Sequence, residues 1–590
     1  MTTYDQDAKT LELPWPFTGR EDELELVRAS PASGRHGIVV TGPAGCGKTR
    51  LITEAVRGTE RARVTGTPET RGLPFAAFAH LLPDTVSLHR AVQLLSGVRL
   101  LVVDDAHLLD EASAALVHQL AVHGRTRLIV AATDGVTAPG AVSRLWTGEV
   151  LPRLSLEPLP REDTAGLLAS SRLEALTTDR LHRLCQGDLR LLRDLLGALR
   201  ASGRLTREPD GDEWAWRGPV PVTPAVRERL ARVLERSGPG ERETLDRLAF
   251  CEPLSLPLDE FDLRVLEELE ADGLVHVDGS GRAALAHPLH GPVLRATAGR
   301  LRARRLTPAP ERLGPALEAE QAVFVRQLEQ QKVTAVPAPV GDWLLAEELP
   351  VPAPYAAVRA RYARLRGEVR EAVAWAREGV RWTPGDVGCC RERDLAQGEL
   401  GEDGAARGEA GGGAPGVSDG GEVFAAYDAV RLGAPERAAG RLPADGVFAR
   451  HAEALARRDG TGLDRVAEEL TERGFVLFAA EACAQAVRAH RDPRAARLSR
   501  TRAVALARRC QGARTPALSG LVLGELTARQ RQIVALAAAG LSNRQIAERL
   551  TLSVRTVGNH LYSAYTRLGA SDRGALPWLM EMPMPEARPA

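Results

Sequence analysis

The stretch that most constrains the fold is residues 42–49, Gly-Pro-Ala-Gly-Cys-Gly-Lys-Thr. It follows an apolar run, 37–40, and precedes a run compatible with a helix, 50–56. Strand, glycine-rich loop and helix in this order are typical of a phosphate-binding loop, in which backbone N–H groups and the helix N-terminus face phosphate oxygens. The alternative is a glycine-rich turn without a ligand. The chain has only three lysines against 74 arginines, so this pattern is rarely produced by chance.

The motif predicts that Lys48 reaches the β- and γ-phosphates of a nucleotide and that Thr49 holds Mg²⁺ through its hydroxyl. The predicted nucleotide-binding residues of the loop are Gly42, Pro43, Ala44, Gly45, Cys46, Gly47, Lys48, Thr49 and Arg50.

The composition excludes several classes of protein. At 590 residues the chain exceeds the size of one hydrophobic core, so several domains are expected. The 77 basic residues balance the 77 acidic residues, so any basic surface must be local. The seven cysteines are odd in number and form no Cys-x-x-Cys pair, which argues against a disulfide scaffold or a zinc site. The chain shows no signal peptide and no run of 18 apolar residues, so a cytoplasmic location is expected.

Short apolar strands alternate with helical stretches between residues 37 and 160. The expected strands are 37–41, 62–65, 100–103, 127–132 and 150–156. This alternation predicts a parallel sheet with helices on both faces and with ligands at the carboxyl ends of the strands. One of these ends carries two acids, Asp104 and Asp105. The alternative role of both acids is to cap a helix that begins near residue 106.

Beside the phosphate-binding loop, this pair of acids resembles the second half of a P-loop ATPase site. The resemblance implies that Asp104 holds Mg²⁺ through water. It also implies that Asp105 orients or deprotonates the attacking water, which must lie in line with the γ-phosphate. His107 follows in the motif Asp-Asp-Ala-His-x-x-Asp at 104–110 and has no assigned role.

The segment of Gly19, Arg20 and Glu21 resembles the Gly-Arg-Glu box of the AAA-type and STAND ATPases. In that family the box lies over the adenine, so Gly19 and Arg20 are predicted to contact the nucleotide. The alternative is a simple helix start with Thr18 as its cap.

The chain departs from that family at two places. Asp134 stands where the family often has an arginine that senses the γ-phosphate, which predicts slow hydrolysis. Gly187-Asp188-Leu189 replaces the Gly-x-Pro contact to adenine. The resemblance therefore implies phosphate binding more firmly than selection of adenine.

Residues 161–216 have helical periodicity and resemble the small lid domain of this ATPase class. In 217–300 a helix, 266–273, is followed by two apolar stretches around the turn 278–281. Helix, strand, turn and strand predict a winged helix, which alone would be a DNA-binding module. After a STAND-type ATPase it implies a wing that closes over the nucleotide, with His287 at the β-phosphate of ADP. The alternative is a surface histidine before a proline.

Residues 301–515 consist mainly of helix-forming residues. A tetratricopeptide-like array is one interpretation, and no strict period of 34 residues is found. The glycine-dense segment 398–421 predicts a flexible linker between two helical blocks. The expected organisation is a tail at 1–15, a P-loop domain at 16–160, a lid at 161–216, a winged helix at 217–300, helical regions at 301–397 and 422–515 around the linker, a DNA-binding domain at 516–580 and a tail at 581–590.

Residues 526–576 carry the second strong signal, a pattern of three short amphipathic helices. Thr527 and Ser553 stand at N-cap positions, and the two later helices, 543–550 and 554–567, are joined by a tight turn. Residues 520–577 contain seven arginines and only three acids, so positive charge is concentrated here.

The segment resembles the LuxR-type DNA-binding domain through Ser-Asn-x-x-Ile-Ala at 542–547, Ser-x-x-Thr-Val at 553–557 and Arg-Leu-Gly at 567–569. It departs from the family at Gln530 and Gly558. The alternative is a three-helix bundle that binds protein. The predicted readers of base edges are Asn559, Tyr562 and Ser563, and the predicted phosphate contacts are Arg544, Arg555, Arg567 and Arg573. The remaining predicted DNA-binding positions are Thr527, Asn543, Ser553, Thr556, Val557 and His560.

Together the two ends resemble the large ATP-binding regulators of the LuxR family. The expected fold is multidomain: an α/β P-loop ATPase domain with helical lid and winged helix, an α-helical middle, and an all-α helix-turn-helix at the C-terminal end. The resemblance implies a transcription regulator that uses ATP or ADP with Mg²⁺, and an activator is expected rather than a repressor. Its expected partners are promoter DNA, further copies of itself, RNA polymerase and an unidentified inducer.

Two alternatives stay open at this stage. The first is a DNA-binding regulator whose nucleotide site binds ATP without hydrolysing it. The second is a P-loop enzyme with an incidental helical tail.

Overall fold

The computed structural model describes residues 17, 19–30, 36–207, 212–234, 237–279, 281–306, 313–401, 421–438, 440–522, 530, 533–534, 536–537, 540–550 and 554–568. The chain divides into two compact units. Unit 1 comprises Met1–Leu173 and Thr177–Thr307, and unit 2 comprises Glu174–Leu176 and Pro308–Ala590. The expected tails, the centre of the glycine-dense segment and the turn before the last helix lie outside the described residues.

Unit 1 begins with a parallel sheet in the order β2-β3-β4-β1-β5. Its strands are β1 (Gly37–Gly42), β2 (Ala62–Thr65), β3 (Leu100–Asp104), β4 (Arg127–Thr133) and β5 (Arg153–Ser155). Every pairing is parallel, and Gly37 of β1 is in register with Leu128 of β4. The predicted parallel α/β sheet is confirmed, and only its last strand is shorter than expected.

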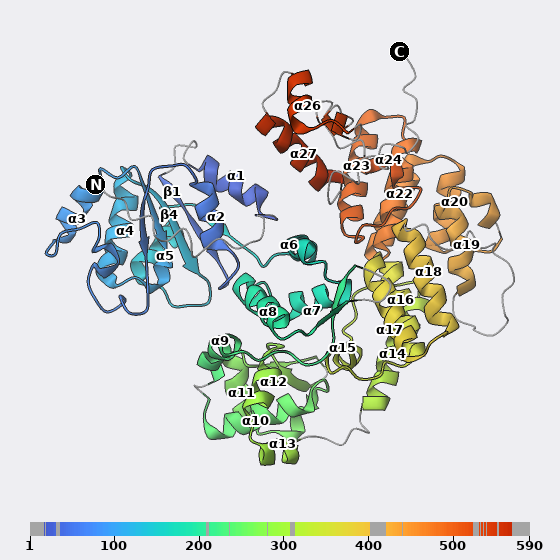
Figure 1. Cartoon of the computed structure of the whole chain (residues 1–590), viewed down its shortest axis with the longest axis horizontal. Helices are drawn as coiled ribbons and strands as arrows, with labels where there is room; N and C mark the ends of the chain where they lie inside the picture. Colours follow the sequence, from blue (N-terminus) through green and yellow to red (C-terminus); the bar gives the residue numbers. More distant parts are fainter. Residues whose placement is uncertain are drawn as a thin grey trace. The chain divides into compact units, whose positions relative to one another are not determined.

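Helices cover both faces of this sheet, with α4 and α5 on one side and α1 and α2 on the other (Figure 1). They are α1 (Glu21–Ala29), α2 (Lys48–Ala55), α3 (Leu88–Leu95), α4 (Glu111–His123) and α5 (Gly140–Thr147). Because side chains alternate along a strand, Val39 packs into the cluster of α3–α5 while Ile38 and Val40 pack into that of α1 and α2. A strand covered on both faces reads as a continuous apolar run, which made these strands visible in the sequence.

The remainder of unit 1 shares one apolar core that runs from Leu159 to Leu294. Its helices are α6 (Arg161–Leu168), α7 (Ala175–Cys185), α8 (Leu189–Ala201), α9 (Pro224–Leu234), α10 (Pro239–Cys251), α11 (Leu263–Ala271), α12 (His290–Thr297) and α13 (Arg300–Leu306). Its strands are β6 (Leu205–Arg207), β7 (Trp214–Trp216), β8 (Leu256–Pro257), β9 (Val275–Val277) and β10 (Arg282–Leu285). The expected succession of helix, strand, turn and strand is found in α11, β9 and β10. β8 joins them as an unpredicted third antiparallel strand.

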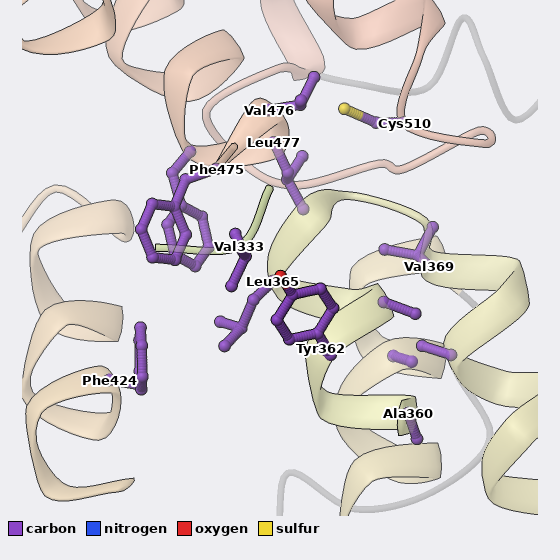
Figure 2. Close-up of a cluster of buried hydrophobic side chains, with 14 of the residues drawn as sticks. Val333, Ala360, Tyr362, Leu365, Val369, Phe424, Phe475, Val476, Leu477 and Cys510 are labelled. Atoms are coloured by element: carbon purple, nitrogen blue, oxygen red, sulfur yellow. The ribbon is translucent and has the colours of Figure 1, made fainter. Parts of the chain in front are cut away.

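Unit 2 is helical and has one large apolar core. Its helices are α14 (Leu313–Glu329), α15 (Pro339–Ala346), α16 (Ala353–Arg366), α17 (Val369–Trp382), α18 (Val387–Leu400), α19 (Gly421–Arg431), α20 (Val447–Ala456), α21 (Gly460–Glu472), α22 (Val476–Ala489), α23 (Pro493–Arg508) and α24 (Ser519–Val522). Figure 2 shows Tyr362 and Leu365 on one side of this core with Phe424 and Phe475 on the other. The two helical blocks around the glycine-dense segment therefore pack into a single core.

Buried ion pairs also connect these two blocks. Arg431 of α19 donates to Glu399 of α18 at 2.8 Å and to Glu481 of α22 at 2.7 Å, and all three side chains are buried. Within the first block, Arg364 of α16 also pairs with Glu392 of α18 at 3.0 Å. Each buried charge in this network faces an opposite charge, as burial in a low-dielectric interior requires.

The last two described helices are α26 (Asn543–Leu550) and α27 (Val554–Leu568), at the predicted positions. They pack around a small apolar cluster that includes Ile533, Ile546, Val557 and Leu561. Among the described residues, none of the helices is both long and apolar enough to cross a membrane.

Candidate nucleotide site and DNA-binding helices

The predicted phosphate-binding loop, residues 42–49, joins the carboxyl end of β1 to the first turn of α2. Gly45 and Gly47 have φ angles of +75° and +99°, a conformation that favours glycine over every L-residue. Lys48 is buried, and its Nζ donates to the carbonyls of Gly42 at 2.8 Å and Pro43 at 2.7 Å. Cys46 is buried beneath the loop, while Pro43 and Ala44 are exposed. The ammonium group thus lies against the loop to which the motif assigns phosphates.

The two side chains predicted to hold the metal, Thr49 and Asp104, are 55 positions apart in the sequence and are in contact in the structure. Thr49 Oγ1 donates to Asp104 Oδ1 at 3.1 Å. Asp104 is 4% exposed, and its other oxygen pairs with Arg63 of β2 at 2.9 Å. A hydroxyl and a buried carboxylate are the donor types that Mg²⁺ takes, with water and phosphate completing its coordination, so these residues fit the ion. The sequence reasoning missed Arg63, because nothing local marks it among 74 arginines.

Asp105 follows with a φ of +47°, which turns the chain sharply after the strand. Burial, and then the negative charge of Asp104, raise the pKa of its carboxyl group. Neither Asp104 nor Asp105 caps a helix through its side chain. Asp110 has that role, since it accepts hydrogen bonds from the backbone N–H and the hydroxyl of Ser113 at the start of α4.

His107, left without a role by the sequence, has a structural contact. Its Nδ1 accepts a hydrogen bond from the N–H of Thr133 at 3.3 Å, which leaves the ring proton on Nε2. Burial lowers the pKa of this imidazole. His107 therefore joins the ends of β3 and β4 as a neutral ring.

Asp134 occupies the strand end at which the family that the chain resembles often has an arginine. Its N–H donates to the carbonyl of Gly42 at 3.1 Å, and its carboxylate pairs with Arg153 at 3.0 Å. Arg153 also donates to Thr41 Oγ1 at 2.8 Å. An arginine is thus present at this edge, supplied by β5, and it is held by Asp134 and Thr41.

Gly19 and Arg20 lie at the junction of β5 and α6. Arg20 donates to the carbonyl of Glu157 and pairs with Glu23 at 2.8 Å. Gly19 has a φ of +72°, and a Cβ built there would lie 2.7 Å from Cγ of Asp163. Burial is the main cause of a raised pKa for Asp163. The structure places both predicted residues beside the segment that joins β5 to α6.

Asp188 and Leu189, in the segment predicted to be a lid, contact the glycine-rich loop 42–49. The N–H of Leu189 donates to the carbonyl of Gly45 at 3.0 Å. Asp188 caps α8 and pairs with Arg229 of α9 at 2.6 Å. A Cβ on Gly45 would lie 2.1 Å from Asp188 Oδ1, so only glycine leaves room for this carboxylate. Asp188 was noted in the sequence only as a departure from a family motif.

His287 is half-buried, and its Nδ1 accepts a hydrogen bond from the N–H of Leu289 at 3.1 Å. Burial lowers its pKa, and the charge of Asp188 acts in the opposite direction.

The predicted DNA-binding residues are distributed over α26 and α27. Asn559 and Tyr562 are exposed and three positions apart, so they lie on the same face of α27. Arg544 is exposed, and Asn543, Thr556 and His560 are half-buried. Val557 is fully buried in the cluster between the helices, so its side chain supports the fold and does not face solvent.

Six of the predicted positions cannot be placed in this way. Thr527, Ser553 and Arg573 lie outside the described residues, and the side chains of Arg555, Ser563 and Arg567 lie outside the described side chains.

Residues 524–577 match the family model of bacterial regulatory proteins, luxR family. The chain carries a LuxR-type helix-turn-helix domain. Both helices of the turn, α26 and α27, fall within the matched residues.

Proteins named HTH-type transcriptional regulators are similar to this chain over a short region. One from Mycobacterium bovis and two from strains of Mycobacterium tuberculosis are each 44% identical over 78 residues. That region is 13% of this chain and only 9% of each relative.

A comparison with solved structures finds a STAND protein with a tetratricopeptide repeat sensor from Pyrococcus horikoshii. It is 13% identical, with a TM-score of 0.24, over 96% of this chain and 95% of that one.

Proposed function

We propose that this chain is a transcription regulator in which a nucleotide bound to unit 1 controls DNA binding by the LuxR-type domain. The observation that carries the proposal is the contact between Thr49 and Asp104 at the phosphate-binding loop of a chain that also holds a LuxR-type domain. A P-loop enzyme with an incidental tail is disfavoured, because an enzyme of small substrates has no use for such a domain.

Nucleotide binding would begin at Lys48. Its ammonium group exchanges the carbonyls of Gly42 and Pro43 for the β- and γ-phosphates, while the N–H groups of the loop face phosphate oxygens. Thr49 and Asp104 would hold Mg²⁺, which neutralises phosphate charge when bound. Arg63, now paired with Asp104, would keep that carboxylate oriented.

Asp105 is the residue we assign to the attacking water. Its carboxylate follows the proposed metal-holding Asp104 directly, which puts a potential proton acceptor next to the proposed metal. Hydrolysis would nevertheless be slow, because Arg153 at the sheet edge is already paired with Asp134. This pair favours a second candidate function, a regulator that binds ATP and does not turn it over.

The LuxR-type domain would read promoter DNA with α27. Asn559 offers the amide that pairs with adenine in the major groove, and the exposed Tyr562 lies beside it. Arg544 would bind phosphate and fix the register of the domain without selecting sequence. Binding of this kind weakens steeply with salt, because counterions are released.

The switch between states would be at the lid. Asp188 links the phosphate-binding loop, α8 and α9 through Gly45, its helix cap and Arg229. We propose that ADP maintains this closed arrangement and that ATP, with an inducer at the helical unit, opens it for self-association, promoter binding and contact with RNA polymerase in the cytoplasm. A switch of this type requires a nucleotide whose affinity differs between the two states.

The deciding experiment measures mass in solution and promoter affinity together for the full chain with ATP, ADP or neither. We expect ATP to increase both mass and affinity relative to ADP. The Lys48→Ala chain is the matched control and should give one mass and one affinity under all three conditions. Equal DNA affinity of the natural chain in all three conditions would refute nucleotide control, and loss of salt-sensitive DNA binding altogether would refute the regulator itself.

A further inference from the structure

Unit 1 has a cavity of about 660 Å³ that the proposed function does not use. Among the described residues, its lining includes four arginines, Arg28, Arg99, Arg125 and Arg127, and one acid, Glu60. We call this the arginine pocket. The chain as a whole has equal numbers of basic and acidic residues, so a ratio of four to one is a local concentration of positive charge.

The arginine pocket lies at the opposite edge of the sheet from the phosphate-binding loop. Leu100 opens β3 and Arg127 opens β4, whereas the phosphate-binding loop follows the last residue of β1. The six residues of β1 separate the two edges by roughly 20 Å. A nucleotide on the phosphate-binding loop therefore cannot reach the arginine pocket.

Among the described residues, two of the four arginine charges in the pocket are not compensated by the protein. In the part of the chain that the structure describes, the side chains of Arg99 and Arg125 have neither a hydrogen bond nor an ion pair. Arg28 donates to a neutral group, the carbonyl of Glu54, at 3.2 Å. Like charges gathered around one concave surface repel one another, and an anion between them removes that repulsion.

The floor of the arginine pocket is apolar and includes Val56 and Leu100, which are buried in the cluster between the sheet and α2. A cavity of this size with an apolar floor and a few charged groups at its rim is typical of a site for a small molecule. A nucleic acid backbone would pair with the arginines and would use none of the apolar lining. The combination favours a compact ligand that has both an apolar body and a doubly charged anionic group.

We propose that the arginine pocket binds a small phosphorylated metabolite, with its phosphate on Arg99 and Arg125 and its apolar body on the floor. Such a ligand would act on the nucleotide site through α2. This helix begins at Lys48 and Thr49 and ends at the wall of the arginine pocket with Ala55 and Val56, about 12 Å away. The effect on the nucleotide rests on the proposed function, whereas binding to the arginine pocket does not.

The test uses 1-naphthyl phosphate, a fluorescent dianion with an apolar body, titrated into the full chain. We expect saturable binding to the natural chain and to Lys48→Ala, because the arginine pocket is separate from the loop. The double variant Arg99→Glu/Arg125→Glu should bind at least tenfold more weakly. The milder Arg99→Gln/Arg125→Gln should lose several-fold, and an unchanged thermal midpoint shows that it is folded.

The matched control is Arg90→Glu/Arg264→Glu, which reverses two exposed arginines of unit 1 outside the arginine pocket and should bind within twofold of the natural chain. Inorganic phosphate should compete more weakly than the naphthyl compound, because it leaves the floor uncovered. Loss of binding in Lys48→Ala, or unchanged binding in both Arg99/Arg125 double variants, would overturn the proposal. If a short DNA duplex displaced the probe from Arg99 and Arg125, these arginines would be assigned to nucleic acid binding, and the proposal would be overturned as well.

Discussion

The contact between Gly45 and Asp188 leads to a prediction for Gly45→Ala. The new Cβ would lie 2.1 Å from Asp188 Oδ1, so the start of α8 must withdraw from the phosphate-binding loop. Withdrawal removes the hydrogen bond from Leu189 to the loop, weakens the cap of α8 and separates Asp188 from Arg229.

Each of these three contacts contributes about 1 kcal/mol. An alanine in the left-handed region costs about 1 kcal/mol more. The total destabilisation of unit 1 is therefore about 4 kcal/mol, which corresponds to a drop of roughly 8 °C in the midpoint of a unit of this size.

Gly47→Ala is the matched control for this prediction. Gly47 also has a positive φ, but a Cβ there meets only a methyl group of Leu189, at 3.5 Å. Its cost should be confined to the backbone, about 1 kcal/mol, or roughly 2 °C. Calorimetric unfolding of the full chain measures both variants.

A second substitution tests the cause directly. In an Asp188→Ala background the carboxylate is absent, so Gly45→Ala should cost about 1 kcal/mol there instead of about 4. The reasoning would be refuted if the two glycine variants were equally destabilised, or if Gly45→Ala and Asp188→Ala were additive within about 0.5 kcal/mol.

Three further predictions concern the nucleotide site and unit 2. Lys48→Ala should abolish ATP binding in calorimetry while leaving promoter affinity in the absence of nucleotide unchanged, and intact ATP affinity would contradict the site. Asp105→Asn should slow any turnover more than it weakens ATP binding, and equal turnover would exclude Asp105 as the base. Burial lowers the pKa of His451 to about 4, so its neutral form contributes stability that is fully present above about pH 6.5 and is lost as the pH falls to about 4. The thermal midpoint of unit 2 should therefore fall less between about pH 6.5 and about pH 4 in His451→Gln than in the natural chain, by the equivalent of roughly 3 kcal/mol. An unchanged fall would show that other groups cause the acid sensitivity.

The features that could be predicted from the sequence are local. The apolar strands, the glycine-rich loop and the LuxR-type helices are each encoded within one short stretch, by hydrophobic period or by a motif. The meeting of Thr49 with Asp104 was also predictable, because the carboxyl ends of neighbouring parallel strands share one edge of the sheet.

The contacts that escaped prediction join residues far apart in the chain. Arg63, Arg153 and Arg229 each find their carboxylate only after folding, and in a chain with 74 arginines no local signal singles them out. The union of the two helical blocks was hidden because the glycine-dense segment indicates separation, whereas buried aromatic and charged side chains on both sides of it pack together. The helix cap formed by Asp188 could have been predicted from the sequence, since an aspartate directly before an amphipathic helix is a typical N-cap.

The ion pair between Arg431 and Glu399 has a consequence for how unit 2 can be divided. A cut in the chain between Leu400 and Gly421 would leave a fragment ending with α18 and a fragment beginning with α19, and neither could bury its half of the core alone. The cut would also separate Glu399 from Arg431, although each keeps a partner on its own side, Arg364 for Glu399 and Glu481 for Arg431. Co-expressed fragments are thus expected to reassemble by complementation, so this position offers a place to split the protein into two halves whose reunion reports on the folded state.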